Sequence, residues 1–337
     1  MRNTPPSKAT TIGDVAAAAG VSRATVSRVM NGRDTVDAAI ADRVRRVATE
    51  LHYRPSETAR NLSLGRTQTV AVVVPDLGNP MFQSILRGVT RAAAQDGYRV
   101  LVADTQETAE AERDIALDAR RRCDALVLCA PRMDDEGLAE VLAAAAPVVL
   151  VNRTVDADSV PQVATDYAQV AGLLIDHLVA LGHRHLIHLG GPLASASNRF
   201  RIAGLDRAEQ RHPGLRIDRR TLGSGLEDGW SSAEDVLASG ATAVIAFNDL
   251  VALGLISRLR EMDVAVPGRI SVVGVDDIPF AGFSDPLLTT VSVPQVDLGV
   301  AAWQRLLRAI DGEAASGPLW LEGTLQERAS AGPAPTD

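Results

Sequence analysis

Apolar runs that alternate with helical stretches constrain the fold of this chain more than any other feature. Seven runs of strand length follow residue 67, namely TVAVVVP, YRVLVAD, DALVLCA, PVVLV, HLIHLGG, TAVIAFN and ISVVGVD. Helical stretches separate them, among them Gln83–Asp96, Tyr167–Leu181 and Leu250–Met262. Strands that are apolar along their whole length are typical of parallel sheets covered by helices on both faces. We therefore predict an α/β core with two parallel sheets, of about 95 and 130 residues, and a ligand cleft at the carboxyl ends of the strands.

The size and composition of the chain indicate a soluble protein of two or three domains. It has 337 residues, of which 46% are hydrophobic and 23% are charged. No apolar run approaches the roughly 20 residues that span a bilayer, and the N-terminal MRNTPPSKATT lacks the apolar core of a secretory signal. Cys123 and Cys129 are too far apart along one strand to form a disulfide. These features favour a cytoplasmic protein with free thiols and no membrane partner.

The charge is distributed unevenly along the chain. Residues 1–67 contain eleven basic and six acidic side chains, which gives this segment a net charge of +5. The whole chain has a net charge of −8, so the residues after 67 carry a net charge of −13. A small basic segment on a large acidic body is expected where that segment meets a polyanion such as nucleic acid. Chance clustering of surface arginines is the alternative explanation.

Helix-capping residues divide the basic segment into three short helices. Thr11, Ser22 and Asp37 each precede a run with helical spacing, and each residue type caps helices well. Gly20 ends the first helix with a tight turn, because glycine tolerates a positive φ. Two helices joined by a glycine turn form a helix-turn-helix, whose second helix enters the major groove of DNA.

The second helix, within GVSRATVSRVMNG, has one face for a small core and one for DNA. Val21, Val26 and Val29 supply the core. On the other face, we expect Arg23 and Arg28 to contact base edges, because arginine matches the paired acceptors of guanine. Ala24 can at most touch a thymine methyl. The residues expected to hold phosphates are Thr11, Ser22, Thr25, Ser27 and Asn31.

The segments TIGDVAAAAGVSRATVSRVMNG and LHYRPSETARNLSLGRTQTVAVVVPD closely resemble the headpiece and linker of the LacI–GalR family of transcriptional regulators. The resemblance continues through nearly the whole chain. It implies a hinge helix that forms only on the operator, paired with that of a dimer mate, with Leu62 inserted in the minor groove beside Ala59. The family usually has asparagine where this chain has Ser56, but both residues can cap a helix. A flexible linker with an incidental leucine is the alternative.

The same resemblance implies a core with the two-lobed fold of periplasmic sugar-binding proteins. The expected divisions are a helix-turn-helix headpiece at 1–56, a hinge at 57–67 and an effector-binding core at 68–337. The first lobe is expected to comprise about 68–163 and 293–312, and the second about 164–292 and 313–330. One reading helix covers half a site, so we expect a homodimer on a palindromic operator. The C-terminal RASAGPAPTD cannot form a coiled coil, which favours dimers over the tetramers known in the family.

Candidate effector-binding residues lie at the ends of predicted strands. The loop and helix GGPLASASNRFRIAG offer hydroxyls and an arginine, which suit a polyhydroxyl ligand such as a sugar or polyol. By this chemistry and by the resemblance, we expect ligand contacts from Asn152, Ser195, Ser197, Arg201, Asn248 and Asp276. Apolar faces for a sugar ring are expected from Phe82, Trp230 and Phe247. The alternatives are a structural salt bridge for Arg201 and Asp276, and simple packing for Phe82 and Trp230.

Other motifs do not support a different function. GSGLEDG has the wrong spacing for a dinucleotide-binding loop, and a strand would place His188 on the opposite face from His183 and His185. We find no nucleophile elbow, no phosphate-binding loop and no supported carboxylate pair. We therefore expect a ligand-responsive transcriptional repressor with no metal, no cofactor and no enzymatic activity. A sugar-binding receptor or a sugar-metabolising enzyme with a similar core is the alternative.

Overall fold

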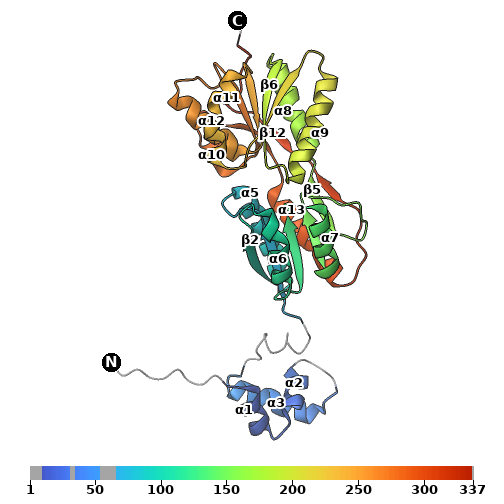
Figure 1. Cartoon of the computed structure of the whole chain (residues 1–337). Coiled ribbons are helices and arrows are strands. Elements are labelled where there is room, and N and C mark those ends of the chain that lie inside the picture. The colour runs from blue at the N-terminus through green and yellow to red at the C-terminus, as the bar shows by residue number, and fades with distance from the viewer. Residues whose placement is uncertain (1–9, 31–34, 54–65, 336–337) are drawn as a thin grey trace, which may run out of the picture. The chain divides into compact units, whose positions relative to one another are not determined.

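The computed structural model describes residues 10–30, 35–53 and 66–335, and divides the chain into two compact units (Figure 1). The first unit spans Met1–Thr67 and the second spans Gln68–Asp337.

The described part of the first unit is a bundle of the three predicted helices, α1 (Ile12–Ala19), α2 (Arg23–Met30) and α3 (Ala38–Glu50). Thr11 and Asp14 form a reciprocal capping box at the start of α1, and Gly20 ends it with a φ of 64°. The Asp37 side chain accepts two backbone N–H groups at the start of α3. The small core consists of Val15, Ala16, Ala19, Val26, Val29, Ala41, Val44 and Ala48.

The first sheet of the second unit has the strand order β11-β5-β4-β3-β1-β2, and every pairing in it is parallel. Its strands are β1 (Thr69–Val74), β2 (Arg99–Asp104), β3 (Ala125–Cys129), β4 (Val148–Val151), β5 (Gln162–Thr165) and β11 (Leu319–Leu321). Helices α5 (Pro80–Gln95) and α13 (Gln295–Ile310) cover one face, and α6 (Ala109–Arg120) and α7 (Asp135–Ala144) cover the other. This sheet and its helices form the first lobe.

The second sheet has the order β12-β10-β9-β8-β6-β7, in which only the β10–β12 pair is antiparallel. Its strands are β6 (His185–Gly190), β7 (Arg216–Thr221), β8 (Ala243–Ala246), β9 (Ser271–Asp276), β10 (Thr289–Ser292) and β12 (Thr324–Gln326). Helices α8 (Tyr167–Ala180) and α9 (Ala196–Arg211) pack on one face. On the other lie α10 (Leu226–Ser231), α11 (Ala233–Ala238), α12 (Asp249–Glu261) and the short helix η1 (Pro279–Gly282). These elements form the second lobe.

The α/β architecture with two mainly parallel sheets confirms the expected fold class, and α13 returns to the first lobe as expected. Gly88 of α5 and Gly299 of α13 allow the two helix backbones to meet, because a Cβ at either position would lie 2.2 Å from a carbonyl oxygen of the other helix.

One expected lobe boundary was wrong. Strand β5 ends at Thr165 and belongs to the first sheet, so the first crossing follows residue 165, close to the expected boundary at about 163. Strand β11 also pairs with β5 in the first sheet, so the last crossing lies between residues 321 and 324 and not at 312. The physical reason is that β11 covers the free edge of β5, and the Asp166 N–H donates to the Leu321 carbonyl at 2.8 Å.

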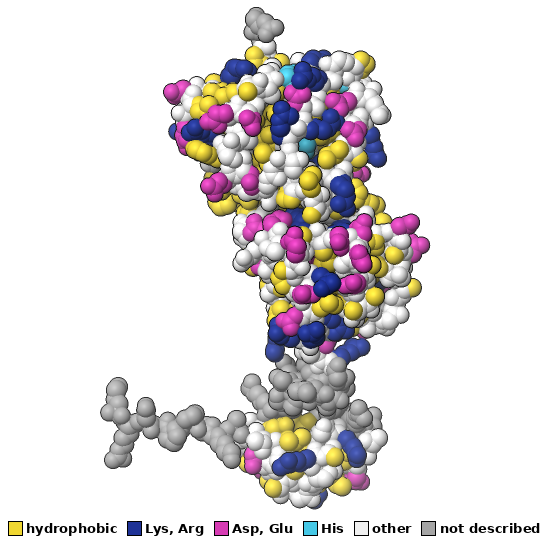
Figure 2. Space-filling model, viewed as in Figure 1, with side chains coloured by type: hydrophobic (Ala, Val, Ile, Leu, Met, Phe, Trp, Pro, Cys, Tyr) yellow, Lys and Arg dark blue, Asp and Glu magenta, His cyan; other side chains and the backbone are white. Residues whose placement is uncertain are grey.

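The core has an acidic surface region and two buried thiols, as its sequence predicts. Asp and Glu side chains gather on the first lobe near the junction of the lobes, on the face shown in Figure 2, in keeping with the acidic charge of the core. Cys123 and Cys129 are buried free thiols. Among the described residues, no helix is both long and apolar enough to cross a membrane.

Candidate functional site

A small cavity lies between the two lobes, where the carboxyl ends of both sheets face each other. The first lobe contributes Asn79, Met81, Phe82, Glu107, Ala130, Arg132 and Asn152 to its wall. The second lobe contributes Tyr167, Ser197, Arg201, Ser224, Phe247, Asn248 and Asp276. The free volume is only about 10 Å³, roughly the room that one water requires. The walls therefore nearly touch in this conformation.

Strained backbone positions surround the cavity. Glu107, Ala130, Asn152 and Asp276 all have positive φ values, between 45° and 109°, and each ends or follows a different strand of the two sheets. Non-glycine residues adopt this conformation at a cost in free energy, and such positions cluster at ligand-binding sites. The strain therefore marks the same edge of both sheets as a functional region.

Arg201 is the central cation of the cavity. Its side chain leaves α9 and is buried, with the guanidinium carbon 3.9 Å from the centre of the Tyr167 ring and 4.5 Å from that of Phe247. Its Nε and Nη1 have no hydrogen-bond partner among the described residues. Burial lowers the pKa of the guanidinium from its ordinary value. Donors left without partners in a buried site point to a ligand that accepts from them.

Asp276 is the matching acceptor on the second lobe. It ends β9, it is buried, and its Oδ1 has no partner within the described part of the chain. Burial raises the pKa of this carboxyl to about 7, although the positive charge of Arg201 opposes the shift. The structural salt bridge considered for Arg201 and Asp276 is not among the ion pairs of the described residues. Both side chains retain unused hydrogen-bonding capacity towards the cavity.

The start of α9 is fixed by its own hydroxyl groups. The Ser195 side chain accepts from the Asn198 N–H and lies 2.9 Å from the Ser197 hydroxyl. The Asn198 amide in turn holds the backbone of Gly191 through two hydrogen bonds of 3.2 Å. Ser197 lines the cavity, whereas Ser195 is buried behind it. The structure therefore gives Ser195 the position of a helix cap that orients Ser197.

The two predicted asparagines also line the cavity while holding local structure. Asn152 accepts from the Thr165 N–H at 3.0 Å and donates to the Tyr167 hydroxyl at 3.4 Å. Asn248 caps α12 by accepting from the Val251 N–H at 2.9 Å. Both side chains are therefore held in fixed rotamers at the cavity wall.

Phe82 and Phe247 line the cavity, whereas Trp230 does not, so the expected effector contact of Trp230 stays a prediction. Trp230 is 39% exposed, with Arg258 4.4 Å above its ring, and its indole N–H donates to Glu261. The reason is the packing of α10 on α12. Gly229, the residue before Trp230, lies against the Val251 carbonyl, which turns the tryptophan to the outside.

Sequence reasoning missed half of the cavity residues, namely Asn79, Met81, Glu107, Ala130, Arg132, Tyr167 and Ser224. Arg132 donates to both oxygens of Glu107, at 2.7 and 3.0 Å, and Tyr167 lies under Arg201. Their position just after strands β1, β2, β3, β5 and β7 was the available signal. No metal site is present in the described ranges, where no group of three His, Cys, Asp or Glu side chains could hold an ion.

The first unit presents the predicted reading surface on α2. Ser22, Arg23, Ala24 and Arg28 are exposed, and Thr25 and Ser27 are half-buried. The Ser22 hydroxyl caps α2 by accepting from the Thr25 N–H at 3.1 Å. Thr11 performs the same role for α1. The remaining predicted DNA contacts, Asn31, Ala59 and Leu62, lie outside the described residues, as does most of the predicted hinge.

Comparisons with known proteins identify the same two parts. Residues 67–319 match the family model of periplasmic binding proteins and sugar-binding domains of the LacI family, and residues 11–56 match that of bacterial regulatory proteins of the lacI family. The chain is 34% identical to the transcriptional regulator AscG of Escherichia coli strain K12, over 95% of this chain and 98% of the relative. It is 31% identical to the transcriptional repressor CytR of the same strain, over 90% of this chain and 91% of the relative.

Solved structures of transcriptional regulators also match nearly the whole chain. The lac repressor dimer bound to operator and the anti-inducer ONPF matches with a TM-score of 0.83 and 29% identity, over 96% of this chain and 99% of that one. The complex of the transcriptional regulator CelR with cellobiose matches with a TM-score of 0.72 and 28% identity, over 95% and 99%. These relatives are regulators and not enzymes. The chain belongs to the LacI family of bacterial regulatory proteins.

Proposed function

We propose that this regulator is a homodimeric, cytoplasmic repressor whose affinity for a palindromic operator is controlled by a sugar or polyol in the cavity between the lobes. One observation carries the effector assignment: the Arg201 donors and the Asp276 acceptor are buried at the same cavity and have no hydrogen-bond partners among the described residues. A sugar hydroxyl can donate to the carboxylate while its oxygen or a neighbouring one accepts from the guanidinium.

A neutral polyhydroxyl ligand fits these groups better than an anion or a planar base. An anion would satisfy Arg201 but would face the Asp276 carboxylate. The two aromatic rings nearest the cation, Tyr167 and Phe247, are already engaged with it at 3.9 and 4.5 Å. The cavity of about 10 Å³ must widen before a ring can enter, and a ligand that contacts both lobes would then stabilise the arrangement of the lobes that it bridges.

Thermal-shift screening of the whole protein against sugars, polyols and nucleobases tests the effector class. We expect stabilisation by a member of the first two groups and by no nucleobase. A gel-shift assay with DNA from upstream of its own gene, with and without the stabilising compound, then tests control of operator binding. Stabilisation by a nucleobase alone would contradict the proposed class.

Effector affinity is expected to depend on pH through Asp276. A hydroxyl that donates to the carboxylate binds its ionised form, and the pKa of the free site is about 7. The affinity should therefore fall about tenfold between pH 8 and pH 6. Titration calorimetry at both values, with the compound from the screen, measures this change. In Asp276→Asn the pH dependence should vanish, and its persistence would assign the titration to another group.

The same pKa predicts how Asp276 affects stability. The pKa of Asp276 is about 7 in the folded protein and near 3.8 in the unfolded chain. At a pH between these two values, the Asp276 carboxyl is therefore protonated in the folded protein and ionised in the unfolded chain. The favourable contribution is thus complete below about pH 4 and is lost as the pH rises through 7. Asp276→Asn should consequently be more stable than the parent at pH 8, which denaturant unfolding measures.

Arg23 is expected to read a base on each half of the operator. It is exposed at the first turn of α2, the part of a recognition helix that meets base edges. Arg23→Ala should cost roughly 1–3 kcal/mol in operator binding and relax one symmetric pair of positions. Binding to a set of single-substituted operators measures both effects. Equal weakening on every sequence would show that Arg23 contacts phosphate instead.

A further inference from the structure

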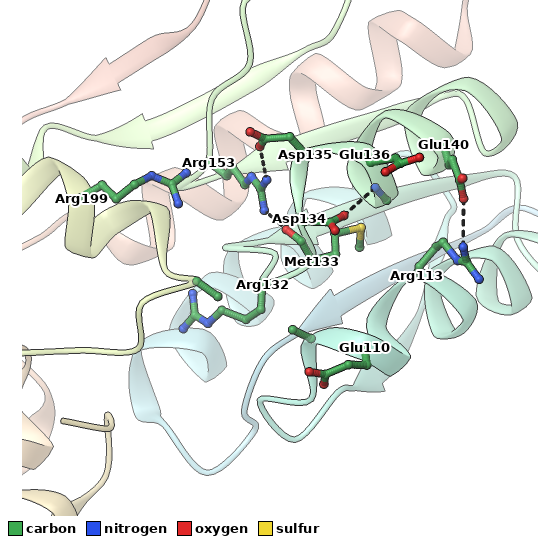
Figure 3. Close-up of a pocket in the computed structure, with 13 residues that line it drawn as sticks. Glu110, Arg113, Arg132, Met133, Asp134, Asp135, Glu136, Glu140, Arg153 and Arg199 are labelled. Atoms are coloured by element: carbon green, nitrogen blue, oxygen red, sulfur yellow. Dashed lines mark hydrogen bonds and ion pairs between the residues drawn. The ribbon is translucent and has the colours of Figure 1, made fainter. Parts of the chain in front are cut away.

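A second, larger hollow approaches the effector cavity from the side of α6 and α7. This groove has a volume of about 800 Å³, and most of its lining comes from the first lobe, with Ala194 and Arg199 from the second (Figure 3). Arg132 lies at the end of the groove away from the Arg113–Glu140 ion pair. Among the described residues, Arg132 alone lines both the groove and the cavity. Its side chain therefore lies between the groove and the buried cavity.

The Arg132 side chain is held by one carboxylate and one backbone carbonyl, and its own backbone is anchored separately. Its Nε and Nη2 donate to the two oxygens of Glu107 at 2.7 and 3.0 Å, and its Nη1 donates to the Ala130 carbonyl. Its backbone N–H donates to the buried carboxylate of Glu112 at 2.6 Å, as does that of Met133. The side chain can consequently swing once its contacts with Glu107 and the Ala130 carbonyl break, while the backbone remains anchored.

Glu107 links this ion pair to the opposite lobe. The loop after β2 holds it at a φ of 55°, next to Gln106 at 51°, and strain of this kind is common at moving parts of binding sites. The Ser224 hydroxyl of the second lobe donates to Glu107 at 3.5 Å, a long contact. The Glu107 carboxylate is 27% exposed, whereas Arg132 is 4% exposed, so solvent reaches the pair from the carboxylate side.

We infer that the groove is the entrance to the effector cavity and that Arg132, locked by Glu107, is the gate between them. The inference rests on the proposed effector site. Entry by separation of the lobes would instead break contacts such as the edge-to-face pair of Phe200 and Trp320, at 5.5 Å, and the hydrogen bond from Gln295 to the Asp276 carbonyl. Entry past Arg132 breaks only local contacts of one side chain, the ion pair with Glu107 and the hydrogen bond to the Ala130 carbonyl. The gate admits small polar molecules, because most of the described side chains that line the groove are charged, and Met133 is the one long apolar side chain among them.

Cysteine labelling tests the gate without any effector. Ser197→Cys places a thiol in the cavity, and its reaction with neutral 2-hydroxyethyl methanethiosulfonate, which releases methanesulfinate and leaves a mixed disulfide, is followed by intact mass. The parent chain, whose two cysteines are buried, gives the background. Arg132→Ala is expected to raise the labelling rate at least about tenfold, because even one lost charge-assisted hydrogen bond shifts an opening equilibrium by that factor. Glu107→Gln, which keeps the arginine in place, should give a smaller increase in the same direction.

Two further variants distinguish the gate from other routes. Arg113→Ala removes a groove arginine that does not touch the cavity, and Phe200→Ala loosens the contact between the lobes. Both should label at the rate of Ser197→Cys alone, with thermal unfolding showing that each variant is folded. Acceleration by Phe200→Ala but not by Arg132→Ala or Glu107→Gln would overturn the gate in favour of lobe separation. The labelling result does not depend on the effector assignment. That assignment is tested separately, and it would be contradicted if operator binding by Arg201 variants still responded to the effector.

Discussion

Replacement of Arg201 by alanine is expected to give a protein that binds its operator normally and no longer responds to its effector. Arg201 offers the cavity the donors that lack partners, and it does so from a buried position between Tyr167 and Phe247. Without them, a ligand in the closed site would lose its charge-assisted hydrogen bonds and leave Asp276 as the main polar contact. The headpiece is a separate unit, so its contacts with DNA should be unaffected.

The size of the lost response follows from allosteric linkage. A coupling of about 1–3 kcal/mol changes operator affinity roughly 5–150-fold in the parent protein, and the variant should show no change. Operator affinity is measured by gel shift with and without the sugar or polyol found by screening. For an inducer, the same factor must describe how operator DNA weakens effector binding in the parent, because linkage is reciprocal.

A matched control comes from the same helix. Arg199 stands two residues before Arg201 on α9, but it is exposed and lines the outer groove, not the cavity. Arg199→Ala changes the charge of the protein equally and should keep the full response. A normal response in Arg201→Ala would show that the effector binds elsewhere. Signalling through Leu62 and the hinge remains a prediction, since that segment lies outside the described residues.

Most of the core architecture was predictable because the central strands are buried along nearly their whole length and are therefore apolar in sequence. Strand β1 is buried at five of its six positions, and β3 and β4 are buried throughout, which produces the continuous apolar runs in the sequence. Edge strand β2 still shows an apolar run, but the other three edge strands carry no such signal. Strand β7 reads RIDRRT and is mostly exposed, and β11 and β12 have only three residues each, so their bounds and the pairing of β11 with the first sheet could not be inferred.

The candidate site was predictable where chemistry coincides with a strand end. Asn152 and Asp276 stand at such ends, and both line the cavity. The Arg132–Glu107 pair was missed because its partners are 25 residues apart, on two loops that only the sheet brings together. The position of Trp230 outside this cavity could not be predicted, because residue type says nothing about which side of α10 packs against α12.

Loss of the dimer is expected to lower operator affinity strongly, because one headpiece reaches only half of a palindromic operator. We expect the second copy of the chain to cover the exposed apolar side chains Phe280, Phe283 and Leu287, which are 60%, 87% and 45% exposed. Beside them lies a groove of about 320 Å³ that includes Ile256, Val264, Val266 and Pro286. The matching lac repressor structure is a dimer on its operator, which supports a second copy as the occupant.

Phe283→Asp should therefore convert the dimer into a monomer and weaken binding to a palindromic operator about 10²–10⁴-fold, because the second headpiece is no longer tethered to the first. A charge at the centre of an apolar interface must be desolvated without a partner, which strongly disfavours association. Sedimentation velocity measures the assembly, and titration with a single half-site separates lost dimerisation from lost DNA contacts, since half-site affinity should not change. Leu226→Asp, at a comparably exposed leucine on α10, should remain dimeric. A dimeric Phe283→Asp with normal operator affinity would place the interface on another face of the core.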